Sequence, residues 1–397
     1  MQFSKLGLSK PILQAIQEQG YEKPTPIQAK TIPIICSGKD IIAAAETGTG
    51  KTASFVLPIL QNLQDAPPVR AKRIRALILT PTRELAIQVE ANVKAYSQHL
   101  ALASLAMYGG VDDEPQKEAL IDGVDILVAT PGRLLDMYTQ RAIHFDEVEV
   151  LVLDEADRML DMGFIGDINK VVEKLPEQRQ NLLFSATMSK QVRFLAKTIL
   201  ENPSEITIKS ASSKPKINQW IIPVDKDKKS ALLSQLMQEH DWPQALIFIE
   251  TKRGAAKLVS QLEKRDIKTE SFHSGRSQAV REQLLEDFKA GKLQYLIATG
   301  VASRGIDIDN LNLVINYDLP DQADDYVHRI GRTGRAGATG EAISLVSRDD
   351  FRSLCYIEKR LGEIIERRVV AGFEPRAELP KSDLNWKPKK APAKRRR

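Results

Sequence analysis

A glycine-rich run near the start of the chain has the residue types that hold phosphate. Ala45-Glu46-Thr47-Gly48-Thr49-Gly50-Lys51-Thr52 follows an apolar segment and precedes a helical pattern. In such a loop, glycines let backbone N–H groups turn toward phosphate oxygens, the lysine reaches the β- and γ-phosphates, and the final hydroxyl can ligate Mg²⁺. The usual pattern begins with glycine, and here Ala45 takes that place. The run predicts a site for ATP and Mg²⁺, with an ordinary glycine turn as the alternative. The residues assigned to it are Thr47, Gly48, Thr49, Gly50, Lys51 and Thr52.

An acidic run about 100 residues later supplies the chemistry that a bound triphosphate needs. Asp154-Glu155-Ala156-Asp157 ends an apolar segment, where the strands of an α/β sheet present ligand-binding groups. Asp154 suits Mg²⁺ coordination, directly or through water, and Glu155 suits orienting and deprotonating an attacking water. Acidic turns are common, so the pairing with the phosphate loop is what favours a hydrolytic site.

The second half of the chain contains three arginines among glycines, in His328-Arg329-Ile330-Gly331-Arg332-Thr333-Gly334-Arg335. Such a charged, glycine-rich string is poorly suited to a hydrophobic core and well suited to binding an anion. The second half has no phosphate loop of its own, so these arginines are expected to reach a γ-phosphate held by the first half. Arginine fingers of this kind contribute about 10³–10⁵ in rate.

Short apolar segments alternate with helical patterns twice, which is typical of parallel α/β sheets with helical crossovers. We therefore predict an α/β fold with a first domain at 1–208, a polar linker at 209–216, a second domain at 217–372 and an unstructured basic tail at 373–397. The strands predicted in the first domain are Asp40–Ala45, Arg75–Thr80, Asp125–Ala129, Val148–Leu153 and Asn181–Ser185. Those predicted in the second are Ala245–Ile249, Lys268–His273, Tyr295–Ala298, Leu313–Tyr317 and Ala342–Val346.

Composition narrows the class of protein further. Hydrophobic content of 42% and charged content of 27% over 397 residues are ordinary for a globular protein. The apolar runs are strand-sized, and Met1–Lys5 has no apolar signal core, so no membrane association or export is expected. Cys36 and Cys355 are far apart and predict free thiols in a reducing cytoplasm, while five scattered histidines argue against zinc.

Basic charge is concentrated at the end of the chain. The last eleven residues hold seven lysines and arginines and no acid, and without these seven the net charge of +5 becomes −2 for residues 1–386. Such a run contacts polyanions without sequence preference, or else is simply a solvated tail.

From Phe3 to about Gly372 the sequence resembles the DEAD-box ATP-dependent RNA helicases, and the motifs above occur in that family's order. The resemblance implies two tandem RecA-like domains, RNA-dependent ATP hydrolysis and local RNA unwinding. Gly20-Tyr21-Glu22-Lys23-Pro24-Thr25-Pro26-Ile27-Gln28 resembles the family's Q motif. It implies that Gln28 binds the adenine edge and Phe3 stacks on the base, with Tyr21 and Lys23 beside them. Without the family, Gln28 is a plain surface amide.

Several short motifs resemble the family's RNA-contacting segments, which bind sugar and phosphate rather than base edges. In the first domain, helix capping by Thr82 and Thr130 is an alternative that is compatible with phosphate binding. In the second, a solvated surface charge is the alternative for Arg253 and Arg276. The residues implied are Pro81, Thr82, Arg83, Gly109, Gly110, Thr130, Pro131, Gly132, Arg133, Thr251, Arg253, Gly275, Arg276 and Thr299.

The resemblance also assigns residues that link the two ligands. Arg332 and Arg335 are implied as the arginine fingers and Gly305 and Asp307 as contacts to the ATP ribose. The residues implied in coupling are Ser185, Thr187, His328 and Arg329. One position departs from the family: many members carry aspartate after the threonine of motif V, and here it is Gly300, which puts the strength of domain coupling in doubt.

Within the family, the run Leu151–Phe164 and the short core with a basic tail most resemble the bacterial RhlE group. That group implies ribosomal precursor particles or the RNA-decay machinery as partners, in addition to single-stranded and short duplex RNA. Two alternatives are a DNA-directed helicase or translocase and a non-catalytic RNA-binding scaffold. The Q motif and the Asp154–Asp157 string oppose the first, and the intact Lys51, Glu155, Arg332 and Arg335 oppose the second.

Overall fold

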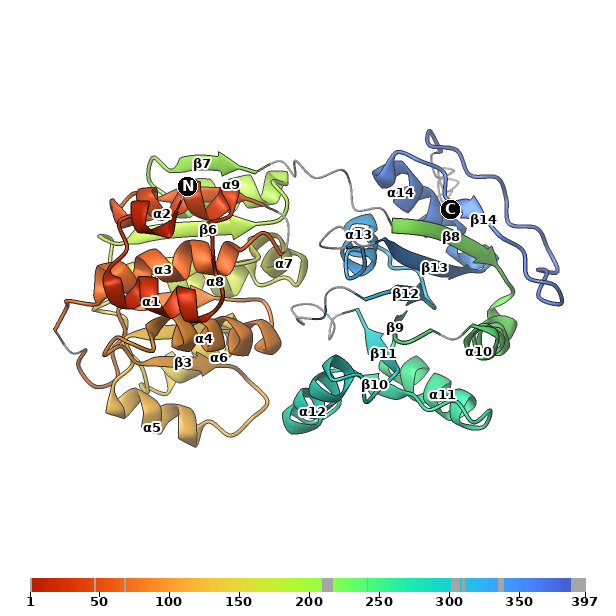
Figure 1. Ribbon diagram of the computed structural model, residues 1–397, viewed down its shortest axis with the longest axis horizontal. Helices are drawn as coiled ribbons and strands as arrows, with labels where there is room; N and C mark the ends of the chain where they lie inside the picture. The colour runs from red at the N-terminus through yellow and green to blue at the C-terminus, as the bar shows by residue number, and fades with distance from the viewer. Residues whose placement is uncertain are drawn as a thin grey trace, which may run out of the picture. The chain divides into compact units, whose positions relative to one another are not determined.

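The fold was taken from a computed structural model that describes residues 2–45, 48–67, 69–208, 217–240, 242–300, 308, 311–334 and 339–386. The chain divides into two units between Ala211 and Ser212, and each is described by itself (Figure 1). The predicted linker at 209–216 and the basic run at 387–397 lie outside the described residues.

The first unit is built on a parallel sheet with the strand order β3-β4-β2-β5-β6-β1-β7. Its strands are β1 (Ile41–Ala44), β2 (Ala76–Leu79), β3 (Ser104–Met107), β4 (Ile126–Ala129), β5 (Val150–Leu153), β6 (Gln180–Ser185) and β7 (Ser204–Thr207). Its helices are η1 (Phe3–Lys5), α1 (Lys10–Glu18), α2 (Pro26–Cys36), α3 (Lys51–Leu63), α4 (Arg83–Ser97), α5 (Glu114–Asp122), α6 (Pro131–Thr139), α7 (Ala156–Asp161), α8 (Ile165–Val172) and α9 (Lys190–Ile199).

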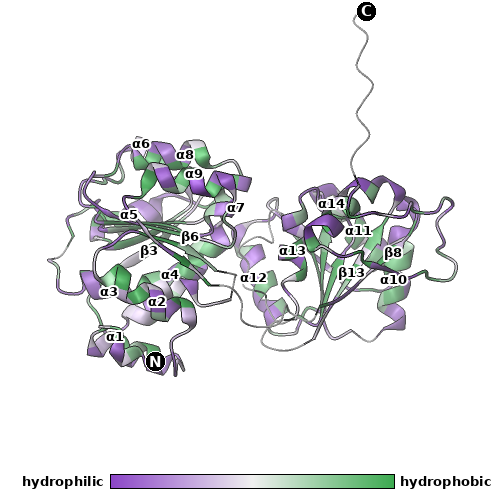
Figure 2. Cartoon of the chain, turned by 90° about the horizontal axis from the view of Figure 1, so that it is seen from above, coloured by the Kyte–Doolittle hydropathy of each residue, from purple (hydrophilic) through white to green (hydrophobic). Residues whose placement is uncertain are grey.

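Alternate strand residues of this sheet point into two separate cores. In β5, Val150 and Val152 pack with α1–α4, whereas Leu151 and Leu153 pack with α5–α9. Figure 2 shows the two helical layers on opposite sides of the sheet. Because both faces are covered, the central strands are apolar throughout, which is why they could be predicted from sequence.

The second unit repeats the arrangement with the order β10-β11-β9-β12-β13-β8-β14, again parallel throughout. The helices α10 and α11 cover one face of this sheet, and α12–α14 cover the other. Its strands are β8 (Ile217–Pro223), β9 (Ala245–Ile249), β10 (Glu270–Phe272), β11 (Tyr295–Thr299), β12 (Leu313–Asn316), β13 (Gly340–Val346) and β14 (Glu366–Arg367). Its helices are η2 (Lys226–Lys228), α10 (Lys229–Glu239), α11 (Lys252–Glu263), α12 (Gln278–Lys289), α13 (Ala323–Ile330), η3 (Arg348–Asp350) and α14 (Phe351–Leu361).

The two strand orders are the same when each unit is numbered from its own first strand. The first strand of each unit, β1 or β8, lies between the sixth and seventh strands and leads to a helix, α3 or α10. The fifth strand of each unit, β5 or β12, lies between the second and sixth. This repeat allows the same position to be compared in the two units.

The ten predicted strands are confirmed, but four strands were missed: β3, β7, β8 and β14. Three of them, β3, β7 and β14, are edge strands, which are less enclosed than central strands and need no continuous apolar run. The strand β8 has the polar residues Asn218 and Gln219 directly after its first residue, so its apolar run is also interrupted.

The prediction that the chain is unstructured after Gly372 is wrong for residues 373–386. Leu379 is buried in the core of the second unit. The Arg367 guanidinium donates hydrogen bonds to the carbonyls of Leu379 and Pro380, at 3.0 and 2.8 Å. The Trp386 ring meets the rings of Phe351 and Tyr356 edge-on. These contacts could not be predicted from the sequence, because they are made by isolated side chains in a proline- and charge-rich segment that has no regular spacing of apolar residues.

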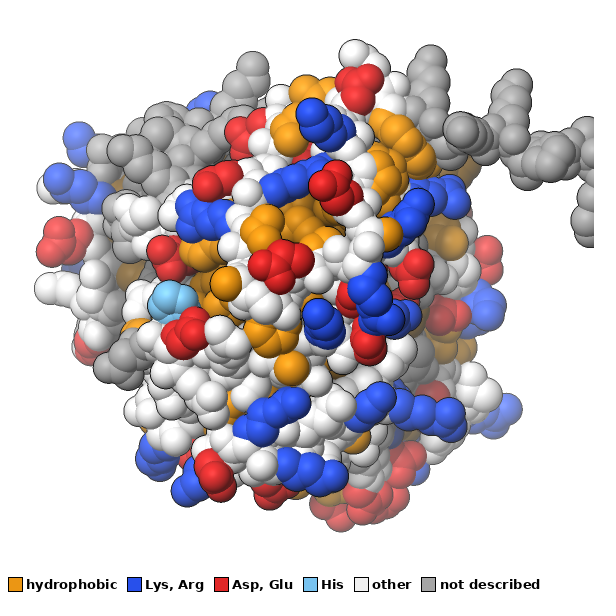
Figure 3. All heavy atoms as spheres, turned by 90° about the vertical axis from the view of Figure 1, so that its right-hand side faces the viewer, with side chains coloured by type: hydrophobic (Ala, Val, Ile, Leu, Met, Phe, Trp, Pro, Cys, Tyr) orange, Lys and Arg blue, Asp and Glu red, His pale blue; other side chains and the backbone are white. Residues whose placement is uncertain are grey.

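Both cysteines are free, with Cys355 buried and Cys36 half-buried, and burial raises the pKa of each thiol. Among the helices of the described residues, none has the length and apolar character needed to span a membrane. On the face of the molecule in Figure 3, basic and acidic side chains are intermixed, in keeping with the near-neutral charge of the body.

Candidate functional site

The phosphate loop of the first unit connects β1 to the start of α3. Gly50 caps α3 in a left-handed conformation, with φ of 89°. A Cβ atom at this position would lie 2.5 Å from Nε2 of Gln28, so only glycine fits. Gly48 is also left-handed, with φ of 79°. Gly48 and Gly50 thus place left-handed turns directly before the N-terminus of α3, and a helix N-terminus favours an anion.

Lys51, the first residue of α3, has a buried ammonium. The side chain is 7% exposed, and no hydrogen-bond partner for Nζ is found among the described residues. A buried charge without a partner is costly unless a ligand completes it. The Lys51 ammonium, the hydroxyl of the next residue and the N-terminus of α3 are groups that fit a magnesium–triphosphate. Thr52 follows on the same helix and is half-buried.

The two carboxylates predicted for catalysis lie at the end of β5, and both are buried. Burial raises the pKa of Asp154 to about 7, and the nearby Lys51 ammonium opposes that rise. A cation bound beside Asp154 would stabilise its charged form. Glu155 has a positive φ of 51°, a conformation that costs free energy for a non-glycine residue and occurs at functional sites. Its Oε2 atom is buried without a partner among the described residues.

The acidic run is hydrogen-bonded directly to the segment that follows β6. Both the backbone N–H and the hydroxyl of Thr187 donate to Asp157, each at 2.9 Å. The Ser185 hydroxyl donates to the Thr187 carbonyl at 2.7 Å. Asp157 was not among the predicted site residues, although it belongs to the acidic run Asp154–Asp157.

The predicted adenine-binding residues surround the start of α2. Gln28 is buried and does not behave as a surface amide: its Oε1 accepts from the Thr25 N–H and its Nε2 donates to the Gly50 carbonyl, at 2.9 and 3.2 Å. Gln28 thereby joins the start of α2 to the phosphate loop. Lys23 is exposed.

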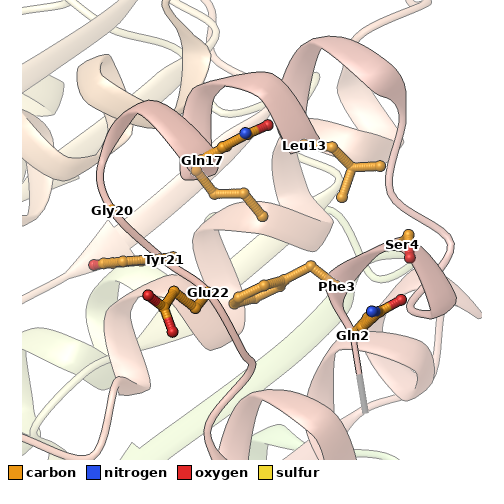
Figure 4. Close-up of a pocket in the computed structure, with 9 residues that line it drawn as sticks. Gln2, Phe3, Ser4, Leu13, Gln17, Gly20, Tyr21 and Glu22 are labelled. Atoms are coloured by element: carbon orange, nitrogen blue, oxygen red, sulfur yellow. The ribbon is translucent and has the colours of Figure 1, made fainter.

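The Phe3 ring is buried and stacks on the Tyr21 ring, with centroids 6.4 Å apart. The Tyr21 hydroxyl is hydrogen-bonded to that of Tyr96 on α4. Both rings line a pocket with Glu22 and with Leu13 and Gln17 of α1 (Figure 4). This arrangement places an aromatic surface and a hollow on the Q-motif side of the first unit.

Three of the predicted RNA segments converge in the first unit. Gly110 has φ of 82°, and a Cβ there would lie 2.3 Å from the Arg83 guanidinium, so Arg83 packs directly against the glycine. Arg133 donates to the Val111 carbonyl at 2.9 Å, and a Cβ at Gly109 would lie 3.9 Å from its Nε. Its Nη1 is buried with no partner in the described part of the chain. Two guanidinium groups therefore lie against one Gly-Gly turn.

The threonines of these segments differ. Thr82 caps α4, accepting from the Leu85 N–H at 3.3 Å, so the capping alternative is correct for it. Thr130 stands at the N-cap of α6 but its side chain makes no capping bond. The flanking Pro81 and Pro131 are buried, and Gly132 is exposed.

In the second unit the predicted RNA residues lie after β9, β10 and β11. Thr251 caps α11, accepting from the Gly254 N–H at 3.0 Å, and Arg253 beside it is exposed. Thr299 ends β11 and is buried. Arg276 is exposed and donates to the Ser271 hydroxyl at 3.2 Å.

Cationic groups gather around His273, which accepts a hydrogen bond from the Gly275 N–H at 3.1 Å. Burial, together with the neighbouring Arg276, Lys252 and Arg281, lowers the pKa of His273. This concentration of positive charge suits a phosphate group.

The arginine string begins on α13. The Arg329 guanidinium lies over the Phe248 ring, 5.0 Å from its centroid, and donates to the Asp318 carbonyl at 2.8 Å. His328 is half-buried and Arg332 is buried. The predicted site residues Thr47, Gly305, Asp307 and Arg335 lie outside the described residues.

The sequence of residues 25–195 matches the DEAD/DEAH box helicase family, and residues 227–337 match the helicase conserved C-terminal domain. The RNA helicase CrhR of Synechocystis is 42% identical over 366 residues, covering 92% of this chain and 73% of the relative. The chain belongs to the DEAD-box RNA helicases. The ATP-dependent RNA helicase DeaD of Escherichia coli is 41% identical, and there the chain spans only 59% of the relative's length.

Solved structures agree with this DEAD-box assignment and with the tandem RecA-like fold. S. cerevisiae Dbp5 bound to RNA and ADP BeF3 matches with a TM-score of 0.82 at 31% identity, covering 93% of this chain and 95% of that one. A DEAD box protein from Methanococcus jannaschii is 40% identical, with a TM-score of 0.51 and coverage of 93% and 99%. For this DEAD-box helicase, ATP and RNA are the ligands to which the two groups of residues above are suited.

Proposed function

We propose that this DEAD-box helicase hydrolyses ATP on its first unit and uses the binding and release of ATP to separate short RNA duplexes. The observation that carries the proposal is the edge of the first sheet where β1 and β5 end. There Lys51 and Glu155 each place a buried charged atom that has no partner among the described residues. A site with those two unmatched groups is complete only with a bound phosphate and a reacting water.

The catalytic roles follow from the chemistry of each group. Lys51 binds the β- and γ-phosphates, and Glu155 orients and deprotonates the attacking water. Thr52 and Asp154 are the residues that would hold Mg²⁺, partly through water. When bound, the ion neutralises charge that develops on the phosphates. Arg332 and Arg335 stabilise the same charge from the second unit.

The remaining contacts to the nucleotide involve its base and ribose. Gln28 and Phe3 bind the adenine, with Tyr21 and Lys23 beside them, and Gly305 and Asp307 bind the ribose. Because Gln28 also contacts the Gly50 carbonyl, a change at the base would be transmitted to the phosphate loop.

RNA is held by its sugar–phosphate backbone on both units, which predicts binding without sequence preference. Thr130, Arg83 and Arg133 supply the first unit's side-chain contacts, helped by Thr82, Pro81, Pro131 and the glycines Gly109, Gly110 and Gly132. Thr251, Arg253, Arg276 and Thr299, with Gly275, supply those of the second unit.

ATP and RNA each bind both units in this scheme, so each favours the closed arrangement and their affinities are reciprocally coupled. Ser185, Thr187, His328 and Arg329 link the two sites. Closure bends one RNA strand in a way that a duplex cannot follow, and a few base pairs are lost. We expect unwinding to fall steeply with duplex length, and unwinding that is independent of length over tens of base pairs would contradict this scheme.

We propose ribosomal precursor particles or RNA-decay assemblies as the partners, and a cytoplasmic location. The support is the likeness of Leu151–Phe164 and of the basic end to the RhlE group, together with the two free thiols. Relatives that match over most of this chain carry the names CrhR, DeaD and CshA, so membership of the RhlE group is a proposal that rests on these sequence features alone.

The deciding experiment is steady-state ATP hydrolysis by the purified chain alone, with single-stranded RNA, and with single-stranded DNA, beside a Glu155→Gln variant. RNA-dependent hydrolysis that disappears in the variant is expected. Equal stimulation by DNA would favour a general nucleic-acid translocase, and hydrolysis under no condition would favour a non-catalytic RNA-binding scaffold.

A further inference from the structure

The second unit has a buried lysine at the position where the first unit has its phosphate-binding lysine. Lys51 is the first residue of α3, which follows the first strand of its unit, and Lys229 is the first residue of α10, which follows the first strand of the other. Lys229 is 2% exposed. It belongs to none of the motifs recognised in the sequence.

The ammonium of Lys229 is fully occupied, in contrast with that of Lys51. Its Nζ donates to the Tyr317 carbonyl at 2.9 Å and to Asp350 at 3.0 Å, and lies 3.5 Å from Asp318. Asp318 lies two residues after β12, the strand that matches β5, so Lys229 and Asp318 occupy the places of Lys51 and Glu155. Protein oxygens surround this ammonium, whereas Nζ of Lys51 has no hydrogen-bond partner among the described residues.

Asp318 in turn holds the two segments proposed to contact RNA and ATP. One carboxylate oxygen accepts from the Glu250 N–H at 3.0 Å, directly before Thr251 at the start of α11. Its carbonyl accepts from Arg329 at 2.8 Å, on the helix that leads to Arg332. The N–H groups of Tyr317 and Asp318 both donate to the Phe248 carbonyl. One short segment thus fixes the backbone before α11 and the side chain of α13.

We propose that Lys229 and Asp318 are positioning residues for RNA-stimulated hydrolysis, at the place in the second unit that the phosphate-binding lysine has in the first. The Lys229 ammonium fixes the carboxylate of Asp318, and Asp318 fixes the start of α11 and the arginine helix as one rigid body. Asp318 therefore connects the proposed RNA contact at Thr251 to the helix that leads to Arg332, the proposed contact to ATP. This inference rests on the proposed function, because it assigns those two contacts to RNA and ATP.

The test separates the two carboxylate partners of the same ammonium. Asp318 and Asp350 are similarly exposed, at 24% and 23% of their side chains, but only the Asp318 carboxylate accepts from the Glu250 N–H. The bond from Arg329 goes to the Asp318 backbone carbonyl, which both variants keep. We would measure ATP hydrolysis against RNA concentration for wild type, Asp318→Ala and the matched control Asp350→Ala, with thermal unfolding of each. Losing the Glu250 hydrogen bond in Asp318→Ala should raise the KM for RNA about fivefold. Asp350→Ala should lower only the melting temperature.

A conservative variant gives a second readout. Asp318→Asn keeps an oxygen that can accept from the Glu250 N–H, so its KM for RNA should return toward the wild-type value. An unchanged KM in Asp318→Ala, or an equal rise in Asp350→Ala, would overturn the inference and leave the proposed function intact. A wild-type chain without RNA-stimulated hydrolysis would overturn the proposed function, and this inference with it.

Discussion

The two units place a lysine at the same position of the same fold and use it in opposite ways. The Lys51 ammonium lies near Asp154 but has no hydrogen-bond partner among the described residues, whereas the Lys229 ammonium is surrounded by Tyr317, Asp318 and Asp350. The first arrangement is unfavourable until a ligand binds, and the second is complete without one. The two lysines therefore differ in one respect: protein groups hydrogen-bond the ammonium of Lys229, and none among the described residues does so for Lys51.

Removing the lysine of the first unit should give the largest effect of all. Lys51→Met is expected to lower RNA-stimulated ATP hydrolysis by about 10²–10³, because it deletes a preorganised charge aimed at the phosphates. The melting temperature, followed by circular dichroism, should change little, because no hydrogen bond of Nζ is lost among the described residues. A variant that unfolds at much lower temperature would contradict the comparison.

The same change in the second unit should act on stability first. Lys229→Met leaves Asp318 and Asp350 without their common cation, which should cost about 3 kcal/mol of unfolding free energy. The three tryptophans of the chain, Trp220, Trp242 and Trp386, all belong to the second unit. Urea unfolding followed by tryptophan fluorescence therefore reports on that unit directly. An unchanged midpoint would show that the Lys229 network is dispensable.

Each unit has a glycine that lies against an arginine side chain, Gly110 in the first unit and Gly300 in the second. Gly110→Ala forces a Cβ against the Arg83 guanidinium and strains a backbone at φ of 82°. Loss of one charge-assisted phosphate contact should weaken single-stranded RNA binding about tenfold, measured by fluorescence anisotropy. Gly163→Ala is the matched control, since Gly163 has a similar φ of 81° but a Cβ there meets nothing within 4 Å. Equal affinities for the two variants would remove Arg83 from the RNA interface.

The smallest effect is expected at Gly300, where the chain departs from the family pattern. A Cβ at Gly300 would lie 3.1 Å from Nη2 of Arg329, a flexible group that can give way. Gly300→Asp would place a carboxylate beside that guanidinium and should stabilise the second unit by about 1 kcal/mol. A lower midpoint of tryptophan-monitored unfolding would show that the close contact outweighs the ion pair.

The features that sequence predicted best are those that repeat an apolar or motif pattern. The central strands carry unbroken apolar runs such as Val150–Leu153, and the phosphate loop and acidic run lie where parallel strands end. The edge strand β7, with Ser204-Glu205-Ile206-Thr207, has no such run and was missed. The packing of residues 373–386 was missed because it depends on single contacts such as that of Arg367 with the Leu379 carbonyl.

Contacts between segments distant in sequence could not be predicted at all. The bond of Gln28 with the Gly50 carbonyl and the bonds of Thr187 with Asp157 join motifs that the sequence only arranges in order. The burial of Lys229 could not be predicted for the same reason, because a single lysine at the start of a helix is normally exposed to solvent. Its role emerges only when β12 brings Asp318 beside it.

The most direct test of the central claim is the number and location of nucleotide sites. An equilibrium titration of the intact chain with a fluorescent ADP analogue should give one site per chain, and Lys51→Met should abolish it. Nucleotide binding that persists in Lys51→Met, or a second site in wild type, would contradict the division between a phosphate-binding lysine in the first unit and a matching lysine in the second that protein groups hold.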